Sequence, residues 1–250
     1  MNQTQRIKRV NKTTAVQKAL ENLREYIKDT VSEVLPNEDE LSRYLGVSRL
    51  TVREATTVLE REGVVSRVQG KGTLINSFVT KLENRIDCGS DIEGCLRQNG
   101  YDVRFEVDEL EFRKATKVEE SKLGLNPEDS ILVVKKILYA NEMAAAVYID
   151  RVPEKLLKTK KFTAEDLRPC IFPTIESLCQ KSITHDVVQL YPHGADEDLA
   201  RIFNIEINTP ILRFDVLEYT SDSITLMYNT EFYTDKFIKF TLCRNVAYKE

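Results

Sequence analysis

Residues 35–73 read LPNEDELSRYLGVSRLTVREATTVLEREGVVSRVQGKGT, and this stretch decides the fold of the first part of the chain. Asn37 followed three residues later by Glu40 is typical of a capping box, which starts a helix. Gly46 favours the left-handed conformation that ends a helix in a tight turn. Ser48 is a preferred N-cap for the helix that follows. Two short helices around a glycine turn predict a helix-turn-helix, a unit that binds DNA.

A helix is also expected before this stretch, over residues 13–31, because apolar residues recur there at steps of three and four. Its apolar stripe comprises Val16, Leu20, Leu23, Tyr26 and Ile27. The second helix is expected to bury Leu41, Tyr44 and Leu45. The third helix, which ends at Gly63, is expected to bury Val52, Ala55, Thr56 and Leu59. These three helices would enclose one small core.

The residues after the third helix predict a hairpin with a basic tip. Val64–Val68 alternates as a strand, Gln69–Thr73 is the glycine-rich tip, and Leu74–Ile75 returns as a strand. The two glycines of the tip permit positive φ and a close approach to a backbone. A helix-turn-helix followed by such a hairpin predicts a winged helix.

The exposed start of the third helix and the hairpin tip supply the candidate DNA contacts. An arginine can donate two hydrogen bonds to a guanine edge in the major groove, and a threonine can meet a phosphate or a thymine methyl. A lysine between two glycines can reach a phosphate or the minor groove. The alternative is an ordinary solvated helix face. The candidates are Arg49, Leu50, Thr51, Arg53, Gly70, Lys71 and Gly72.

This stretch resembles the DNA-binding domain of GntR-type bacterial transcription regulators. The resemblance rests on four elements in order: LP-x-E-x-EL, LGVSR-x-TVREA, L-x-x-EG and Q-G-x-GT. It implies that Arg49, Thr51, Arg53 and the wing at Gly70 contact DNA. The chain departs from the family in having Asp39 where a basic residue is usual, and Leu50 where threonine is frequent. The resemblance therefore predicts an operator that differs from the common family site.

Charge is divided unevenly along the chain. The 250 residues carry 36 Lys and Arg against 40 Asp and Glu, a net charge of −4. Residues 1–76 hold 13 of the bases and 10 of the acids, a net charge of +3 that leaves −7 for residues 77–250. Such asymmetry is a hint of nucleic-acid contact by the basic part.

Several classes of protein lack support in the sequence. Five widely spaced cysteines indicate reduced thiols, and without a Cys-x-x-Cys or a Cys/His cluster no metal site is expected. The only histidines, His185 and His193, are expected at the surface. No catalytic or nucleotide-binding motif occurs, so we expect neither an enzyme nor a cofactor. Since no apolar run approaches about 18 residues and the N-terminus is not of signal-peptide type, we expect a cytoplasmic protein that binds no membrane.

The rest of the chain contains an internal repeat with a shift of 80 residues. In each copy a short helix is followed by two strands: Val118–Leu123, Ser130–Tyr139 and Ala144–Val152, then Glu197–Phe203, Pro210–Tyr219 and Ile224–Tyr233. The match without gaps places Tyr148 opposite Tyr228 in the alignment. Two copies predict one sheet with pseudo-two-fold symmetry, helices covering one face, and a cleft at the axis. Thr163–Leu167 and Pro173–Lys181 are expected to be connecting helices.

This part resembles the UTRA effector-binding domain of the HutC subfamily of GntR regulators. The motif LGL-x-P-x-D-S-I, the strand pair ending at Val152-Pro153, and Asp235-Lys236-Phe237-x-x-Phe240 carry the resemblance. It implies a chorismate-lyase-like fold, a homodimer and a small-molecule pocket in the sheet. The fold class is thus α+β: a winged helix in residues 1–76, a linker in 77–88, and the UTRA-like effector-binding and dimerisation domain in 89–250.

The candidate effector contacts are polar residues on the predicted strands. Relatives that bind phosphosugars often carry two arginines where this chain has Lys136 and Leu138, and acids near Tyr148 and Leu226. A phosphosugar effector is therefore less favoured here. Tyr148 and Tyr228 would offer hydroxyls and ring faces as a symmetric pair, or else pack in the core. The candidates are Lys136, Tyr148, Asp150, Arg151, Tyr228, Glu231, Tyr233 and Asp235.

Two functions compete. The first is a homodimeric transcription regulator, by family expectation a repressor, whose affinity for operator DNA depends on a small-molecule effector that the sequence does not identify. The second is a small-molecule carrier or a chorismate-lyase-like enzyme acting through the C-terminal domain alone. The winged-helix motifs favour the first function, and no nucleophile–base constellation supports the second.

Overall fold

The computed structural model describes residues 15–87, 92–168 and 170–244. The chain divides into two compact units, one formed by residues 1–90 with 240–250 and the other by residues 91–239. Among the described helices, none is long and apolar enough to cross a membrane.

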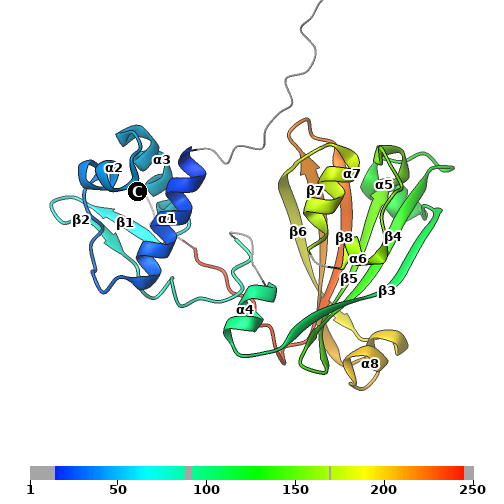
Figure 1. The fold of residues 1–250 in the computed structure, drawn as a ribbon. Coiled ribbons are helices and arrows are strands. Elements are labelled where there is room, and N and C mark those ends of the chain that lie inside the picture. The colour runs from blue at the N-terminus through cyan, green and yellow to red at the C-terminus, as the bar shows by residue number, and fades with distance from the viewer. Residues whose placement is uncertain (1–14, 88–91, 169, 245–250) are drawn as a thin grey trace, which may run out of the picture. The chain divides into compact units, whose positions relative to one another are not determined.

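The first unit contains the predicted helix-turn-helix (Figure 1). Its helices are α1 (Ala15–Asp29), α2 (Glu38–Leu45) and α3 (Arg49–Arg61). The capping box is present, because Asn37 accepts from the Glu40 amide and the Glu40 carboxylate accepts from the Asn37 amide. Gly46 ends α2 at φ +64°, and Ser48 caps α3. These local signals are the ones that the sequence predicts.

The three helices enclose one small core. The predicted residues of α3 are all buried, and α1 contributes Ala19, Leu23 and Ile27 to the same cluster. Tyr44 is an exception, since it is 77% exposed although the sequence analysis expects it in the core. Leu41 and Leu45 pack in this cluster, whereas Tyr44 is rotated by about 100° around α2 from its neighbour Leu45 and is left exposed.

The hairpin of the first unit consists of β1 (Val65–Val68) and β2 (Gly72–Ile75), paired antiparallel. Gly70 and Gly72 have φ of +78° and +88°, a region that side chains rarely enter. Arg67 fixes the hairpin to α3, because its guanidinium donates to Glu60, Thr56 and Thr57 at 3.0 to 3.2 Å. The winged helix is therefore complete.

The last described residues return to the segment after the hairpin. Thr241 forms a bridge with Arg85, and its hydroxyl donates to the Glu83 carbonyl at 2.6 Å. Arg85 in turn donates to the Glu62 carbonyl at 2.6 Å and pairs with Asp87. Residues 240–244 are thus held in the first unit by hydrogen bonds to the chain that leaves it.

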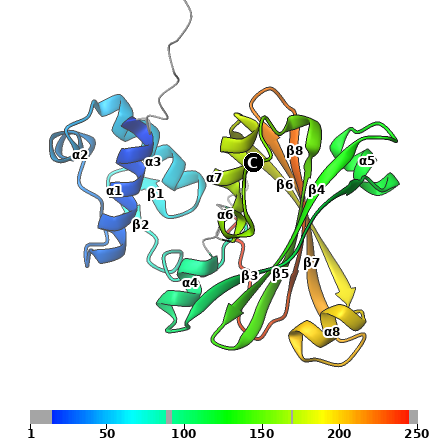
Figure 2. The same ribbon diagram turned by 45° about the vertical axis from the view of Figure 1, so that its right-hand side comes forward.

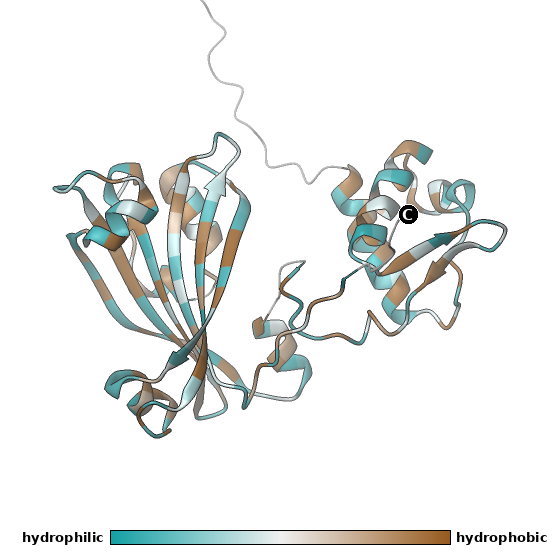
Figure 3. Ribbon diagram, turned by 180° about the vertical axis from the view of Figure 1, so that it is seen from behind, coloured by the Kyte–Doolittle hydropathy of each residue, from teal (hydrophilic) through white to brown (hydrophobic). Residues whose placement is uncertain are grey.

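The second unit is built on one six-stranded antiparallel sheet in the order β3-β4-β5-β8-β7-β6 (Figures 1 and 2). Hydrophobic and hydrophilic segments follow one another along its strands (Figure 3). The strands are β3 (Val103–Lys114), β4 (Ser130–Ala140), β5 (Met143–Pro153), β6 (Ile183–Gly194), β7 (Pro210–Thr220) and β8 (Thr225–Tyr233).

Helices cover both faces of this sheet, not one face as the sequence analysis expects. The helices α6 (Ala164–Leu167) and α7 (Ile171–Cys179), with the 3-10 turn η1 (Glu154–Leu156) between β5 and α6, pack over the face of Leu132 and Val152. On the other face, α5 (Lys117–Leu123) and α8 (Glu197–Phe203) pack at opposite ends of the strands (Figure 2). The helix α4 (Ile92–Gln98) precedes β3. We call the face under α6 and α7 the inner face.

The repeat is real, but its shift is not uniform. Val134 of β4 corresponds to Phe214 of β7, a shift of 80 residues. Val134 pairs with Asp150 of β5, whereas Phe214 pairs with Glu231 of β8, so the second strands are related by a shift of 81. The Thr220 amide donates to the Ile224 carbonyl at 3.0 Å, so three residues, 221–223, form the turn after β7, one more than in the Asn141–Glu142 turn, and this explains the change.

The extra residue overturns the predicted symmetric pair of tyrosines. With a shift of 81, Tyr148 corresponds to Asn229 and not to Tyr228. Tyr148 pairs with Glu231, and Tyr228 pairs with Arg151 three residues along β5. Since side chains alternate between faces, Tyr148 and Tyr228 lie on opposite faces of the sheet. The gapless match is therefore wrong for β5 and β8.

Glu119 of α5 joins three elements of the second unit. It is 4% exposed, and it accepts from Arg113 of β3 at 2.8 Å through both oxygens and from Arg151 of β5 at 2.7 Å. The Thr116 amide also donates to it at 2.8 Å. Burial alone would raise the pKa of Glu119, but the hydrogen bonds from Arg113 and Thr116 lower the pKa to about 2.

We predict that Glu119→Gln lowers the free energy of unfolding by about 2–4 kcal/mol at pH 7, because it leaves two guanidinium groups without their carboxylate. A carboxyl whose folded pKa is depressed stabilises the fold fully above its unfolded pKa, about 4.5, and loses that effect as pH falls toward 2. Denaturant unfolding should show that the difference in free energy of unfolding between the variant and the wild type is smaller at pH 3 than at pH 7. Glu128→Gln, at the exposed pair with Lys114, is the control, and equal effects of both variants at pH 7 would contradict the assignment.

Candidate functional site

The first turns of α3 present the predicted DNA-contacting side chains to solvent. Leu50 is 63% exposed, and Arg49 and Arg53 are exposed as well. Ser48 Oγ accepts from the Thr51 amide at 3.1 Å and lies 2.9 Å from Thr51 Oγ1. The cap therefore holds Thr51 while the two arginines, four residues apart, lie on one side of the helix.

Two acids at the start of α2 pair with these arginines. Arg53 donates to Glu38 through Nε at 3.0 Å and Nη2 at 2.6 Å, and Arg49 pairs with Asp39. The Arg53 hydrogen bond is the main cause that lowers the pKa of Glu38. Glu38 and Asp39 thus orient both arginines before any DNA is present. Asp39 is visible in the sequence as a departure from the family pattern, but neither ion pair is predictable from the sequence.

The hairpin tip presents its backbone without obstruction. A Cβ built on Gly70 would meet no atom within 4 Å, so positive φ and not crowding is what favours glycine there. Lys71 is exposed between the two glycines, and its amide donates to the Val68 carbonyl at 3.0 Å. The tip can therefore approach a phosphate backbone closely, as the sequence predicts.

Five of the eight predicted effector contacts lie together on the inner face of the sheet. Lys136, Tyr148 and Glu231 form one row across β4, β5 and β8. Asp150 lies in the next row, and Lys136 Nζ is 3.3 Å from its Oδ2 with both side chains buried. Tyr233 follows Glu231 on β8, and its hydroxyl donates to Glu231 Oε2 at 2.6 Å. We call these five residues the inner cluster.

The inner cluster is a poor environment for charge. Burial is the largest cause that raises the pKa of Asp150, which the nearby Lys136 opposes. Burial also raises the pKa of Glu231 to about 7, against the hydrogen bond from Tyr233. The pKa of Tyr148 is raised in the same way, with a further contribution from the charge of Glu231. These shifts mark the cluster as a candidate functional site, because desolvated groups with specific partners gather at such sites.

The other three predicted contacts lie elsewhere. Arg151 and Tyr228 are on the opposite face, where the Arg151 guanidinium lies 4.9 Å from the Tyr228 ring centre and pairs with Glu119. Asp235 is exposed after the end of β8. The structure therefore assigns Arg151 to the ion pairs under α5, away from the inner cluster.

Sequence reasoning missed four residues beside the inner cluster. Phe105 and Phe214 add aromatic rings, with centroids 6.2 Å from Tyr148 and 5.3 Å from Tyr233. Asn229 pairs with Asp150 across the strands, and Glu218 lies buried on β7. The sequence of β8 contained the signal for Asn229, because Asn229, Glu231 and Tyr233 are spaced two residues apart and therefore point to the same face.

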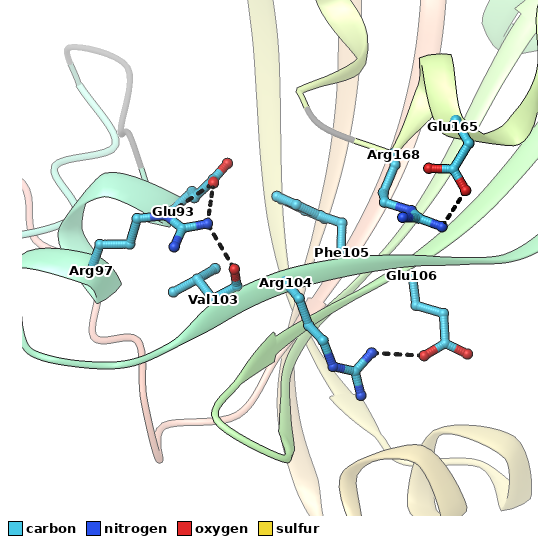
Figure 4. A pocket seen from close by; sticks show the side chains of 8 residues that line it. All are labelled: Glu93, Arg97, Val103, Arg104, Phe105, Glu106, Glu165 and Arg168. Atoms are coloured by element: carbon cyan, nitrogen blue, oxygen red, sulfur yellow. Dashed lines mark hydrogen bonds and ion pairs between the residues drawn. The ribbon is translucent and has the colours of Figure 1, made fainter.

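A pocket of about 510 Å³ lies beside β3, between residues of α4 and the end of α6 (Figure 4). Phe105 lines it, and the Phe105 ring centre is also 5.6 Å from Lys136 Nζ. Arg168 and Glu165 of α6 lie on the Phe105 side of β3, whereas Arg104 and Glu106 project from its other side (Figure 4). Arg97 of α4 also lines the pocket, and donates to Glu93 and to the Val103 carbonyl at 2.9 and 2.7 Å. A small molecule in this pocket would contact Phe105.

Within the described residues, no group of three or more His, Cys, Asp and Glu side chains is arranged to hold a metal ion. The four described cysteines, Cys95, Cys170, Cys179 and Cys243, form no disulfide. The arrangement supports binding of DNA by one unit and of a small molecule by the other.

Each of the two units matches the model of a known protein family. The gntR family of bacterial regulatory proteins matches residues 15–75, and the UTRA domain matches residues 98–237, which is more than half of the chain. The chain therefore belongs to the GntR-type transcription regulators that carry a C-terminal UTRA effector-binding domain. The resemblances seen in the sequence, and the α+β fold class, are confirmed.

Relatives of this chain are named as regulators. The transcriptional repressor NagR of Bacillus subtilis is 24% identical over 178 residues, which cover 71% of this chain and 72% of that protein. MngR of Escherichia coli, named as a repressor of a mannosyl-D-glycerate transport and metabolism system, is 25% identical over 210 residues, 84% of this chain and 86% of that protein. These names support the expectation that the chain is not an enzyme.

Solved structures share the fold. YydK of Bacillus subtilis has a TM-score of 0.76 at 20% identity, and the match covers 93% of this chain and all of that one. PhnF of Mycobacterium smegmatis has a TM-score of 0.58 at 18% identity, over 91% of this chain and 99% of that one. The two-part architecture is therefore one that experimental structures contain.

We predict that Asp39→Asn raises affinity for DNA about three- to tenfold at about 50 mM salt, with less effect at about 200 mM, because it removes a negative charge beside Arg49 from the surface that is predicted to meet phosphates. Fluorescence anisotropy with a labelled duplex measures the change. Glu25→Gln, the same change of charge at an exposed position of α1, is the control. Weaker binding by Asp39→Asn would instead show that the carboxylate is needed to position Arg49.

Proposed function

We propose that this regulator binds operator DNA as a homodimer and that a small molecule in the pocket beside the inner cluster changes its affinity for DNA. Repression that the effector relieves is the form we propose, in line with the names of NagR and MngR. Such a protein acts in the cytoplasm, where the operator lies. The observation that carries the proposal is the exposed face of α3, on which two arginines are pre-oriented beside a capped threonine.

The proposed DNA contacts are those of the α3 start and the hairpin tip. Arg49 and Arg53 would read base edges in the major groove, and Thr51 and Lys71 would meet the backbone. We propose residues 1–76 as the DNA-binding domain, 77–88 as the linker and 89–250 as the effector-binding and dimerisation domain. Residues 240–244 fall within the third of these ranges, but they hydrogen-bond to residues 83–86 of the proposed linker.

We propose that the homodimer forms through β6. Among the described strands β6 pairs only with β7, so its other edge offers unpaired backbone groups. Val187, Leu190 and Tyr191 on this strand are each at least 40% exposed, although they are apolar or aromatic. A second copy is the occupant that a two-fold operator requires, because a C2 interface presents the same surface from both subunits.

Coupling between the sites follows from differential binding. An effector lowers DNA affinity only if it binds the DNA-free chain more tightly than the DNA-bound chain, and DNA then weakens effector binding by the same factor. The proposal thus requires reciprocal effects, measurable from either ligand.

We predict that Arg53→Ala weakens operator binding about 10- to 100-fold, because a bidentate arginine contact with a guanine is lost. The operator is first selected from a random duplex pool, and binding is then measured at several salt concentrations. Arg61→Ala removes the same charge from the other end of α3 and should have a smaller effect on the operator. Equal loss for random and selected duplexes would remove Arg53 from the base-reading residues.

We predict that the double variant Val187→Lys/Leu190→Lys is monomeric at micromolar concentration, because charges on an edge strand oppose pairing. Sedimentation velocity on the full chain measures the oligomeric state. Val118→Lys, on the exposed side of α5, is the control and should leave the wild-type state unchanged. A dimer that persists in the double variant would place the interface elsewhere.

A further inference from the structure

The inner face of the sheet holds more acidic side chains and hydrogen-bond acceptors than basic side chains and donors. Asp150 and Glu218 are buried there and Glu231 is half-buried, whereas Lys136 is the one lysine or arginine among the buried residues of this face. Each carboxylate offers about four acceptor sites, and a lysine offers three donors. Lys136 pairs with Asp150, and the Tyr233 hydroxyl donates to Glu231. The face therefore lacks partners for much of its acceptor capacity.

The side-chain amide oxygen of Asn229 is independent evidence that this face has too few hydrogen-bond donors. Asn229 is 2% exposed, and its Oδ1 is buried without a hydrogen-bond partner in the described structure. Asn229 pairs directly with Asp150 across β5 and β8, so its side chain lies on the inner face beside that carboxylate. A buried acceptor left without a donor destabilises the folded chain. A ligand that donates hydrogen bonds would remove this cost.

Aromatic rings surround the same acceptors. Tyr148 and Tyr233 meet edge to face at 6.0 Å, and Phe214 lies 5.3 Å from Tyr233. Tyr148 and Glu231 retain part of their exposure, and Phe105 lines both the pocket and the cluster. Aromatic faces attract organic cations. Carboxylates, an unpaired amide oxygen and aromatic rings thus occur together at a place next to a pocket.

We propose that the inner face recognises the effector through a protonated amine, which donates to Asn229 Oδ1 and pairs with Glu231 and Asp150. This inference rests on the proposed function, because it names the ligand class of the proposed effector site. A phosphate placed there would meet three carboxyls and one lysine, an unfavourable balance of charge. The effector is therefore a compact organic cation whose charged end lies among the tyrosines.

Proton linkage is the signature of this binding mode. The pKa of Glu231 is raised to about 7 and that of Glu218 to about 8, in each case chiefly by burial. A bound cation favours their charged forms, so binding at pH 7 releases protons and tightens as pH rises from 6 to 8. The charged and titratable groups that face Glu231 are Asp150, Asp186, Lys136, Tyr148, Tyr233 and Glu218.

The test is a thermal-shift panel on the full chain, with metabolite amines set against uncharged and phosphorylated analogues of the same skeleton. Ethanolamine, ethylene glycol and 2-hydroxyethyl phosphate form one such set, in which the amine stays protonated up to about pH 8. We expect at least one amine to raise the melting temperature by about 5 °C at saturation, with its uncharged and phosphorylated analogues inactive. Calorimetry of that amine in two buffers of different ionisation enthalpy should show proton release at pH 7.

Matched variants separate recognition from folding. Glu231→Gln should abolish the shift caused by the amine, and Glu206→Gln, the same change at an exposed position after α8, should not. Asn229→Asp should tighten amine binding, since it adds a negative charge beside the ligand. A residue with a merely structural role would not give this gain.

The inference is overturned if no amine in the panel stabilises the chain, if a phosphorylated analogue stabilises it better than the amine does, or if binding releases no protons. Anisotropy with the selected operator is measured on the same samples. If the wild type binds the operator but does not respond to any amine, the ligand class is refuted and the regulatory function stands. If the wild type does not bind any selected duplex, the proposed function itself is refuted.

Discussion

Each side chain of the six-stranded sheet belongs to one of two faces, because successive residues of a strand point to opposite sides. In the second unit this alternation places the inner cluster on one face of the sheet and the ion pairs of Glu119 on the other. Lys136, Tyr148 and Glu231 form one row on the inner face, next to the pocket. Arg151, one strand position beyond Asp150, points the other way and joins Glu119 beneath α5. The proposed ligand site and the ion pairs of Glu119 thus occupy opposite faces of the same strands.

In the first unit, the exposed arginines of α3 form ion pairs with acidic side chains. The arginines of α3 lie against the acids that begin α2, which limits the conformations that the long side chains sample. In the proposed complex, DNA competes with these carboxylates for the same guanidinium groups. A specific site can do so with directed acceptors, whereas random DNA offers mainly phosphates. The acids therefore favour discrimination between sites over affinity for all of them.

The sequence predicts the local structure well where single residues determine it. Asn37, Gly46 and Ser48 each satisfy backbone groups within a few residues, so their roles are readable without tertiary contacts. The two hairpins of the repeat are likewise visible as runs of β-forming residues. The partners of Arg53 and Lys136 are not predictable in this way, since Glu38 and Asp150 lie 15 and 14 residues away and only packing brings them together. Tyr228 was misplaced because one extra turn residue changes the face of the strand that follows it.

That extra residue also has a consequence for stoichiometry. With the shift of 81, the pseudo-two-fold relates Asp150 to Glu231, so an acid occupies the equivalent position in both halves of the sheet. The lysine is not repeated, because Val216 stands where the first half has Lys136, and the tyrosine is replaced by Asn229. The two halves would therefore form, in the proposed site, a single ligand site with two chemically different ends. One chain should bind one ligand in one orientation, and a dimer should bind two.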